Sequence, residues 1–196
     1  MKKFTLALIA LFLCISIIFP LTVSAELNQY KYFYRGKRYF NLGDYDRAIR
    51  DFTRAIEKEK NYVFAYAERG LAWEKKGSHE KALADYDKAI EINPQYVKAI
   101  KYRATTWQAM GEYAKAIDDY NKVIELDPED SEAFYQIGCI YSKQKDKKDA
   151  LQYLELALEN GYQDFESIEN DPVWDDVKES SEFKELIQKY KQSASL

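Results

Sequence analysis

The sequence of 196 residues predicts an all-α solenoid, a stack of helix-turn-helix hairpins, from three observations. Glycines recur at a spacing of 34 residues, at Gly43, Gly77 and Gly111. On both sides of each glycine, apolar residues follow steps of three, four and seven, the spacing of one helix face. Pro94 and Pro128 stand where the second helix of a hairpin has to end. Because one hairpin cannot bury its apolar face alone, neighbouring hairpins are expected to stack into a superhelix.

The period keeps its register through four repeats without insertions. An alanine lies five residues after each turn position, which is a glycine in the first three repeats. A small residue that lets the two helices approach lies seven residues before each turn position. Asp44 and Ser78, directly after a turn glycine, favour the start of a second helix as N-caps. The predicted repeats cover residues 29–62, 63–96, 97–130 and 131–164 within a domain from 26 to 164. The recurring small residues are Ala48, Ala82, Ala116 and Ala150, and Gly36, Gly70, Ala104 and Gly138.

Residues 165–196 are predicted to cap the stack. Asp171-Pro172 is typical of an N-cap followed by a first-turn proline. Further on, Phe183, Leu186, Ile187 and Tyr190 share one face of a final helix. The end of a solenoid needs such a segment, with its polar side outward.

The repeats closely resemble the tetratricopeptide repeat. The stretches "NLGDYDRAIRDFTRAI", "KKGSHEKALADYDKAIEINP" and "AMGEYAKAIDDYNKVIELDP" carry the resemblance, which covers essentially all of 29–164. The first repeat has Lys60 in place of the terminal proline, and the fourth has Lys145 in place of the turn glycine. The resemblance implies a right-handed superhelix with a concave groove, and a function in binding other proteins.

The first 25 residues have the three parts of a secretory signal. Lys2 and Lys3 precede an uncharged apolar stretch, and Val23-Ser24-Ala25 is a good cleavage site. We therefore expect a signal peptide over 1–25 and a periplasmic or extracellular domain. The less favoured alternative is an uncleaved membrane anchor formed by residues 4–23, which is 20 residues long and just able to span a bilayer.

Composition and motifs argue against several function classes. The formal net charge of −4 disfavours a nucleic-acid partner, which requires a surplus of Lys and Arg. The sequence has none of the common catalytic or phosphate-binding motifs, so no enzyme activity and no cofactor are predicted. His79 and Cys139 are too few ligands for a zinc site, and no metal is expected. A hydrolase that uses two carboxylates is a distant alternative.

Three repeats share an Arg–Asp pair at matched positions, and the fourth repeat replaces both members, with Ile137 and Tyr153. Such joint replacement indicates that the partners touch across the hairpin, as structural ion pairs. The other interpretation is a row of charged ligand contacts. The pairs are Arg35 with Asp51, Arg69 with Asp85, and Arg103 with Asp119.

The family resemblance implies which residues of each first helix line the groove. Aromatic rings beside lysines are good anchors for a peptide, because rings supply contact area and lysines supply positive charge. The clamp for a terminal carboxylate that some family members use does not match, since Phe33, Lys37 and Glu68 replace its lysine and asparagines. The predicted groove residues are Tyr30, Phe33, Tyr34, Lys37, Phe64, Glu68, Lys98, Lys101, Tyr102 and Tyr135.

The sequence thus predicts a protein-interaction module outside the cytoplasm, an adaptor or assembly factor that binds a protein or peptide in its groove. The chief alternative is an accessory subunit assembled through its convex face or its aromatic N-terminal edge, with the groove empty. A membrane contact is expected only through an uncleaved signal. The oligomeric state is not specified.

Overall fold

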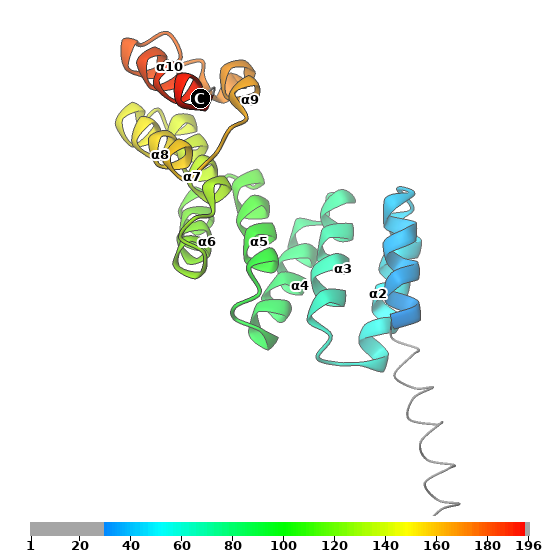
Figure 1. Ribbon diagram of the computed structural model, residues 1–196. Coiled ribbons are helices and arrows are strands. Elements are labelled where there is room, and N and C mark those ends of the chain that lie inside the picture. Colours follow the sequence, from blue (N-terminus) through cyan, green and yellow to red (C-terminus); the bar gives the residue numbers. More distant parts are fainter. Residues whose placement is uncertain (1–29, 195–196) are drawn as a thin grey trace, which may run out of the picture. The chain divides into compact units, whose positions relative to one another are not determined.

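The computed structural model describes residues 30–194, and this part of the chain is built from helices joined by short turns (Figure 1). The predicted signal peptide lies outside the described residues. Residues 30–41 form the first described helix. It is followed by α2 (Tyr45–Lys58), α3 (Val63–Lys75), α4 (His79–Ile92), α5 (Val97–Ala109), α6 (Tyr113–Leu126), α7 (Ser131–Lys143), α8 (Lys147–Glu159), α9 (Phe165–Asn170), the 3-10 helix η1 (Pro172–Trp174) and α10 (Ser181–Ala194).

The helices pack as antiparallel hairpins in the predicted pairs. Helices α3 and α4, α5 and α6, and α7 and α8 lie along one another (Figure 1). The first helices of successive hairpins begin at 63, 97 and 131, and the second at 45, 79, 113 and 147, so the 34-residue period is a period of structure. The chain divides into two compact units, the first ending at Pro94 and the second beginning at Gln95.

A left-handed residue closes the turn of every hairpin. Gly43, Gly77 and Gly111 have φ angles of 75°, 72° and 78°, a region that glycine adopts without steric cost. In the fourth hairpin, Lys145 takes the same conformation with a φ of 63°. The turn geometry therefore persists where the glycine does not.

Aspartate side chains cap several of the helices, whereas Ser78 stands at the predicted N-cap position without a side-chain hydrogen bond. The Asp44 carboxylate accepts a hydrogen bond of 3.0 Å from the Arg47 backbone N–H at the start of α2. Asp130 and Asp146 cap α7 and α8 in the same way. Ser78 occupies the N-cap position of α4, as predicted, but its hydroxyl makes no capping hydrogen bond. The backbone turn closed by Gly77 is enough to start that helix.

Rings packed directly on glycine hold the first unit together. A Cβ atom at Gly36 would lie 2.8 Å from the Phe52 ring, and one at Gly70 would lie 2.6 Å from the Tyr86 ring. Phe52 and Tyr86 are fully buried. The small residues of the period therefore make room for the aromatic side chain of the facing helix, as the sequence indicates.

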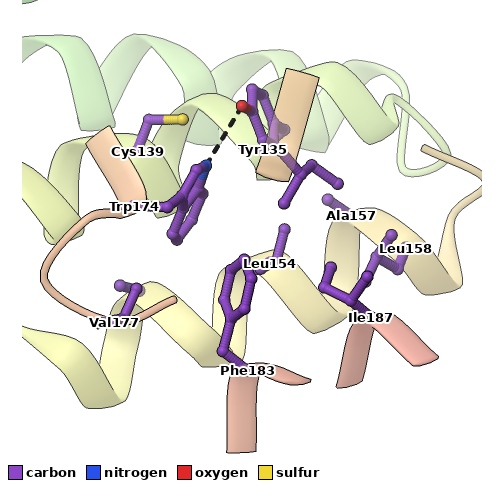
Figure 2. Packing of buried hydrophobic residues seen from close by; sticks show 11 residues of the cluster. Tyr135, Cys139, Leu154, Ala157, Leu158, Trp174, Val177, Phe183 and Ile187 are labelled. Atoms are coloured by element: carbon purple, nitrogen blue, oxygen red, sulfur yellow. Dashed lines mark hydrogen bonds between the residues drawn. The ribbon is translucent and has the colours of Figure 1, made fainter. Parts of the chain in front are cut away.

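A second core lies under the C-terminal cap. Trp174, from η1, is completely buried and points toward Tyr135 of α7, with Leu154 and Phe183 on its other sides (Figure 2). The Trp174 indole Nε1 donates a hydrogen bond of 3.3 Å to the Tyr135 hydroxyl. The Asp171 carboxylate accepts from the Val173 N–H, so Asp171-Pro172 starts a single 3-10 turn. The final helix, α10, begins nine residues after Pro172.

Candidate functional site

The structure brings together each of the three Arg–Asp pairs. In the first repeat, Arg35 Nε and Nη2 donate to Asp51 Oδ2 and Oδ1 at 2.5 and 2.7 Å, a bidentate contact. The corresponding distances are 2.8 and 2.7 Å for Arg69 with Asp85, and 2.9 and 2.6 Å for Arg103 with Asp119. All three carboxylates are buried.

These pairs join the two helices of one hairpin and add a link between neighbouring repeats. Burial raises the pKa of Asp85, and the hydrogen bonds from Arg69 oppose that shift. Arg69 Nη1 also donates a 3.0 Å hydrogen bond to the Thr53 hydroxyl of the preceding repeat. Each guanidinium is thus engaged within the fold, which is the geometry of a structural ion pair.

Exposed aromatic rings gather in the first unit, on the helix over residues 30–41 and the start of α3. Tyr34 is 66% exposed and Phe64 is 51% exposed, and Tyr30 is similarly open. The Tyr30 and Phe64 rings stand edge-on to Tyr62, with centroids 5.9 and 6.1 Å away. We call Tyr30, Tyr34 and Phe64 the aromatic surface.

A buried layer of rings supports the aromatic surface. Phe33 lies 5.1 Å from Tyr62 and 5.5 Å from Tyr34, measured between ring centroids. Burial, with Tyr30 and Tyr34 nearby, raises the pKa of Tyr62, so that hydroxyl stays protonated. Lys37 adds a positive charge at the edge of this layer, with its Nζ 5.9 Å from the Phe33 ring centroid.

Three predicted groove residues are buried, which corrects their assignment as groove contacts. Phe33 is only 8% exposed, because Phe52 and Tyr62 pack over it. Glu68 is 6% exposed within α3. Tyr135 is 4% exposed, because Tyr162 stacks on it with ring centroids 4.3 Å apart and Trp174 packs beside it (Figure 2).

The predicted groove residues of the second unit form contacts of their own. Lys101 Nζ lies 2.9 Å from an oxygen of Asp130, the residue that caps α7. Lys101 therefore ties α5 to α7, and its charge is largely neutralised. Lys98 is exposed, and its Nζ lies 5.3 Å from the centroid of the half-buried Tyr102 ring.

Sequence reasoning did not single out Trp174 as the centre of the cap. Its ring packs with Tyr135, which is one of the predicted groove residues, and with Cys139 on the same helix. Burial raises the pKa of the Cys139 thiol to about 12, while the Tyr135 hydroxyl works in the opposite direction. The signal available in the sequence is a lone tryptophan just after Asp-Pro, in an otherwise acidic stretch.

The pockets beside α10 contain carboxylates that form surface ion pairs. Two open pockets of about 570 and 650 Å³ flank α10, and in each of them one glutamate pairs with a lysine at the surface, Glu179 with Lys184 and Glu155 with Lys189. The pKa of Glu179 is lowered by its hydrogen bond from Lys184, whereas a general acid needs a raised pKa. Among residues 30–194, no group of three or more His, Cys, Asp or Glu side chains could hold a metal ion. None of the helices over that range is both long and apolar enough to cross a bilayer.

The helical hairpins, the left-handed turns and the ring-on-glycine packing define a helical-repeat protein. Profiles described as tetratricopeptide repeat match residues 35–97 and 131–160, and one described as TPR repeat matches 109–145. The chain belongs to the tetratricopeptide repeat family.

Proteins of known sequence and structure agree with this assignment. The chain is 37% identical over 65 residues to a chloroplast protein from Arabidopsis thaliana, and the match spans 33% of this chain and 19% of that protein. Among solved structures, it is similar to MamA, with a TM-score of 0.65 and 26% identity over 72% of this chain and 83% of that one. It is also similar to the second TPR domain of human RPAP3 in complex with the HSP70 peptide SGPTIEEVD, with a TM-score of 0.56 and 28% identity, covering 59% and 97% of the two chains.

Proposed function

We propose that this protein binds a protein or peptide partner through the aromatic surface of its first unit. The observation that carries this proposal is the exposure of Tyr30, Tyr34 and Phe64 together on a rigid buried layer. Rigid aromatic side chains lose little conformational entropy on binding and are common binding hot spots. The capture of a peptide by the similar RPAP3 domain supports this interpretation.

The chemistry of the surface suits a partner with an apolar side chain followed by an acidic group. The rings offer apolar area, and Lys37 offers the positive charge beside them. A clamp for a terminal carboxylate is not proposed here, because Phe33 and Glu68, which take the place of clamp residues, are both buried.

We also propose that the protein acts outside the cytoplasm, as an adaptor or assembly factor of the cell envelope or the extracellular space. The support is the sequence of residues 1–25, with two lysines, an apolar stretch and a Val-Ser-Ala site. The described repeats would then fold after export.

The test combines cross-linking with paired substitutions in the full chain. A photo-reactive phenylalanine analogue placed at Tyr34 should capture one defined partner in intact cells. Tyr34→Ala with Phe64→Ala should weaken binding of that partner at least tenfold, since truncated hot-spot rings commonly cost that much. Met110→Ala is the matched control, because Met110 is also an exposed apolar residue but lies in the second unit.

The thermal unfolding midpoint of the double variant should stay close to that of the parent chain, because both side chains are exposed. Binding that survives in the folded double variant would show that the partner docks elsewhere, and the proposal would be wrong.

A further inference from the structure

A pocket lined by arginines lies between the helix over residues 30–41 and α2. Arg35, Arg47, Arg50 and Arg54 surround it with Tyr39 and Asp51, and its volume is about 250 Å³. We call it the arginine pocket. That volume suits a small anionic group.

Carboxylates within the fold neutralise only part of this charge. Asp51 binds Arg35 in a bidentate contact and also lies 3.4 Å from Arg54 Nη1. Arg47 Nε lies 3.2 Å from Asp44, and the Arg47 guanidinium carbon lies 5.5 Å from the Tyr39 ring centroid. Four guanidinium groups thus share two carboxylates, and positive charge remains.

Arg50 is the group that remains available for a ligand. Its side chain is exposed, and it has no ion-pair partner among residues 30–194. The other three guanidinium groups are held in place by Asp44, Asp51 and ring contacts, and all three arginines line the pocket. Guanidinium groups bind phosphate oxygens in a planar, two-pronged manner.

The arginine pocket is particular to the first repeat. The positions equivalent to Arg50 in the other repeats hold Ala84, Asp118 and Gln152. Those equivalent to Arg54 in the second and third repeats hold Lys88 and Lys122, which pair with a glutamate three residues on.

The same repeat is basic in an acidic protein. Residues 29–62 contain nine Lys and Arg against five Asp and Glu, whereas residues 131–196 contain eight against fourteen. The positive charge is therefore concentrated at one end of the sequence.

That end adjoins the apolar stretch of residues 4–23. Only residues 24–29 separate the stretch from the first described helix, and six residues reach at most about 20 Å. Leu42, at the turn of the first hairpin, is exposed, and its backbone N–H donates a hydrogen bond to the carbonyl of the basic Arg38. Clusters of Lys and Arg that lie close to a membrane surface attract the headgroups of anionic lipids.

We propose that the arginine pocket binds the phosphate groups of anionic phospholipids and holds the first repeat against a membrane surface. This contact uses the faces of residues 30–41 and α2 that carry the arginines. It does not require the aromatic surface, so the two proposals can fail separately.

Flotation of the purified full chain with vesicles tests the proposal. One set of vesicles is phosphatidylcholine alone, and the other contains 30% phosphatidylglycerol. The apolar stretch contributes to binding of both, so the excess on the anionic vesicles reports the basic surface. We expect a several-fold excess at low salt that disappears at 0.5 M salt, because exposed charges are screened.

Arg50→Glu should remove most of this excess, since it reverses one charge near the membrane surface. The matched control is Lys75→Glu, the same charge reversal at an exposed lysine of α3 outside the pocket. Both variants should keep the parent's circular dichroism spectrum and unfolding midpoint. Equal binding to the two kinds of vesicle, or equal losses in the two variants, would overturn the proposal.

Inorganic phosphate separates a lipid headgroup from a soluble ligand. Phosphate that stabilises the parent chain but not Arg50→Glu, compared with chloride at the same ionic strength, would show a phosphate site. If the anionic vesicles then give no excess, the pocket serves a soluble phosphate, and the membrane proposal is wrong.

Discussion

Lys145 is the residue at which the fourth hairpin departs from the other three. It has a φ of 63°, where Gly43, Gly77 and Gly111 have φ angles between 72° and 78°. A left-handed conformation costs an L-residue about 1 kcal/mol relative to glycine. We therefore predict that Lys145→Gly raises the free energy of unfolding by about 0.5–1 kcal/mol, measured by urea denaturation.

The reciprocal change serves as the control. Gly111→Ala should lower the free energy of unfolding by about 1 kcal/mol, because it places a Cβ atom on a backbone with a φ of 78°. A Lys145→Gly chain that is no more stable than its parent would mean that the turn relaxes to accommodate the lysine.

Cys139 is a buried thiol, and its chemistry should follow from that burial. Since burial raises its pKa to about 12, almost no thiolate exists at pH 8, and the thiolate is the reactive form. In a Cys14→Ser chain, we predict no reaction with a thiol reagent such as DTNB at pH 8 until urea unfolds the protein. Rapid labelling of the folded chain would show that the cap opens readily.

The same shift predicts a pH dependence of stability. The thiol ionises near its ordinary pKa of about 9 in the unfolded chain and only near 12 in the folded one. Its contribution to stability is therefore fully present below pH 9 and is lost as the pH rises toward 12. The loss should be smaller in Cys139→Ala, and identical profiles for the two chains would contradict the assignment.

At the scale of helix pairs, the Arg–Asp contacts should act as units. Arg103→Ile alone leaves the buried Asp119 carboxylate without its guanidinium, which should cost about 3 kcal/mol or more. Adding Asp119→Tyr reproduces the combination found in the fourth repeat, Ile137 with Tyr153, and should recover most of that loss. A double-mutant cycle from urea denaturation measures this coupling. Strictly additive losses would mean that the pair contributes no coupling energy.

The cap depends on one side chain from η1. Trp174 is completely buried, so Trp174→Ala should lower the free energy of unfolding by about 3–5 kcal/mol and expose Tyr135 and Cys139 to solvent. The control is Trp107→Ala, at a partly exposed tryptophan of α5, which should cost less. Thermal unfolding and DTNB labelling of Cys139 check both parts of this prediction. If the Trp174→Ala chain stays stable and its Cys139 still reacts slowly with DTNB, contacts other than those of Trp174 hold the cap in place.

The helices can be predicted to within a few residues because they depend on local signals that repeat. A turn glycine and an apolar stripe suffice to place α3, α4, α5 and α6, and α7 and α8 follow by the period even though Lys145 replaces the glycine. The irregular cap is harder, because η1 lasts only three residues and Trp174 is buried by contacts far away in the sequence.

For the molecule as a whole, the sequence predicts which residues share one face of a helix better than it predicts which of those residues are buried. Tyr34 and Phe64 are predicted as groove residues and are exposed, but Phe33 and Tyr135 share that prediction and are buried. What buries them is a ring from another segment, Tyr62 in one case and Trp174 in the other. The spacing within one helix carries no information about such partners. The arginine pocket could not be predicted from the sequence for a similar reason. It combines residues of two helices, and the spacing of those residues along the chain indicates only how the helices pack.

The location of the whole protein is open to a direct test of residues 1–25. If they act as a cleaved signal, intact-mass spectrometry of the protein from its native cells should give a chain that begins at Glu26, because cleavage follows Ala25. Replacing Ala25 with a bulky residue such as Trp should block cleavage, because the site requires a small side chain, and the uncleaved chain should then remain with the membrane fraction. Ser24→Trp is a suitable comparison, because the middle residue of a Val-Ser-Ala cleavage site can be large without blocking cleavage. A full-length mass in native cells, together with protection of the repeats from added protease, would place the folded domain inside the cell and overturn the export proposal.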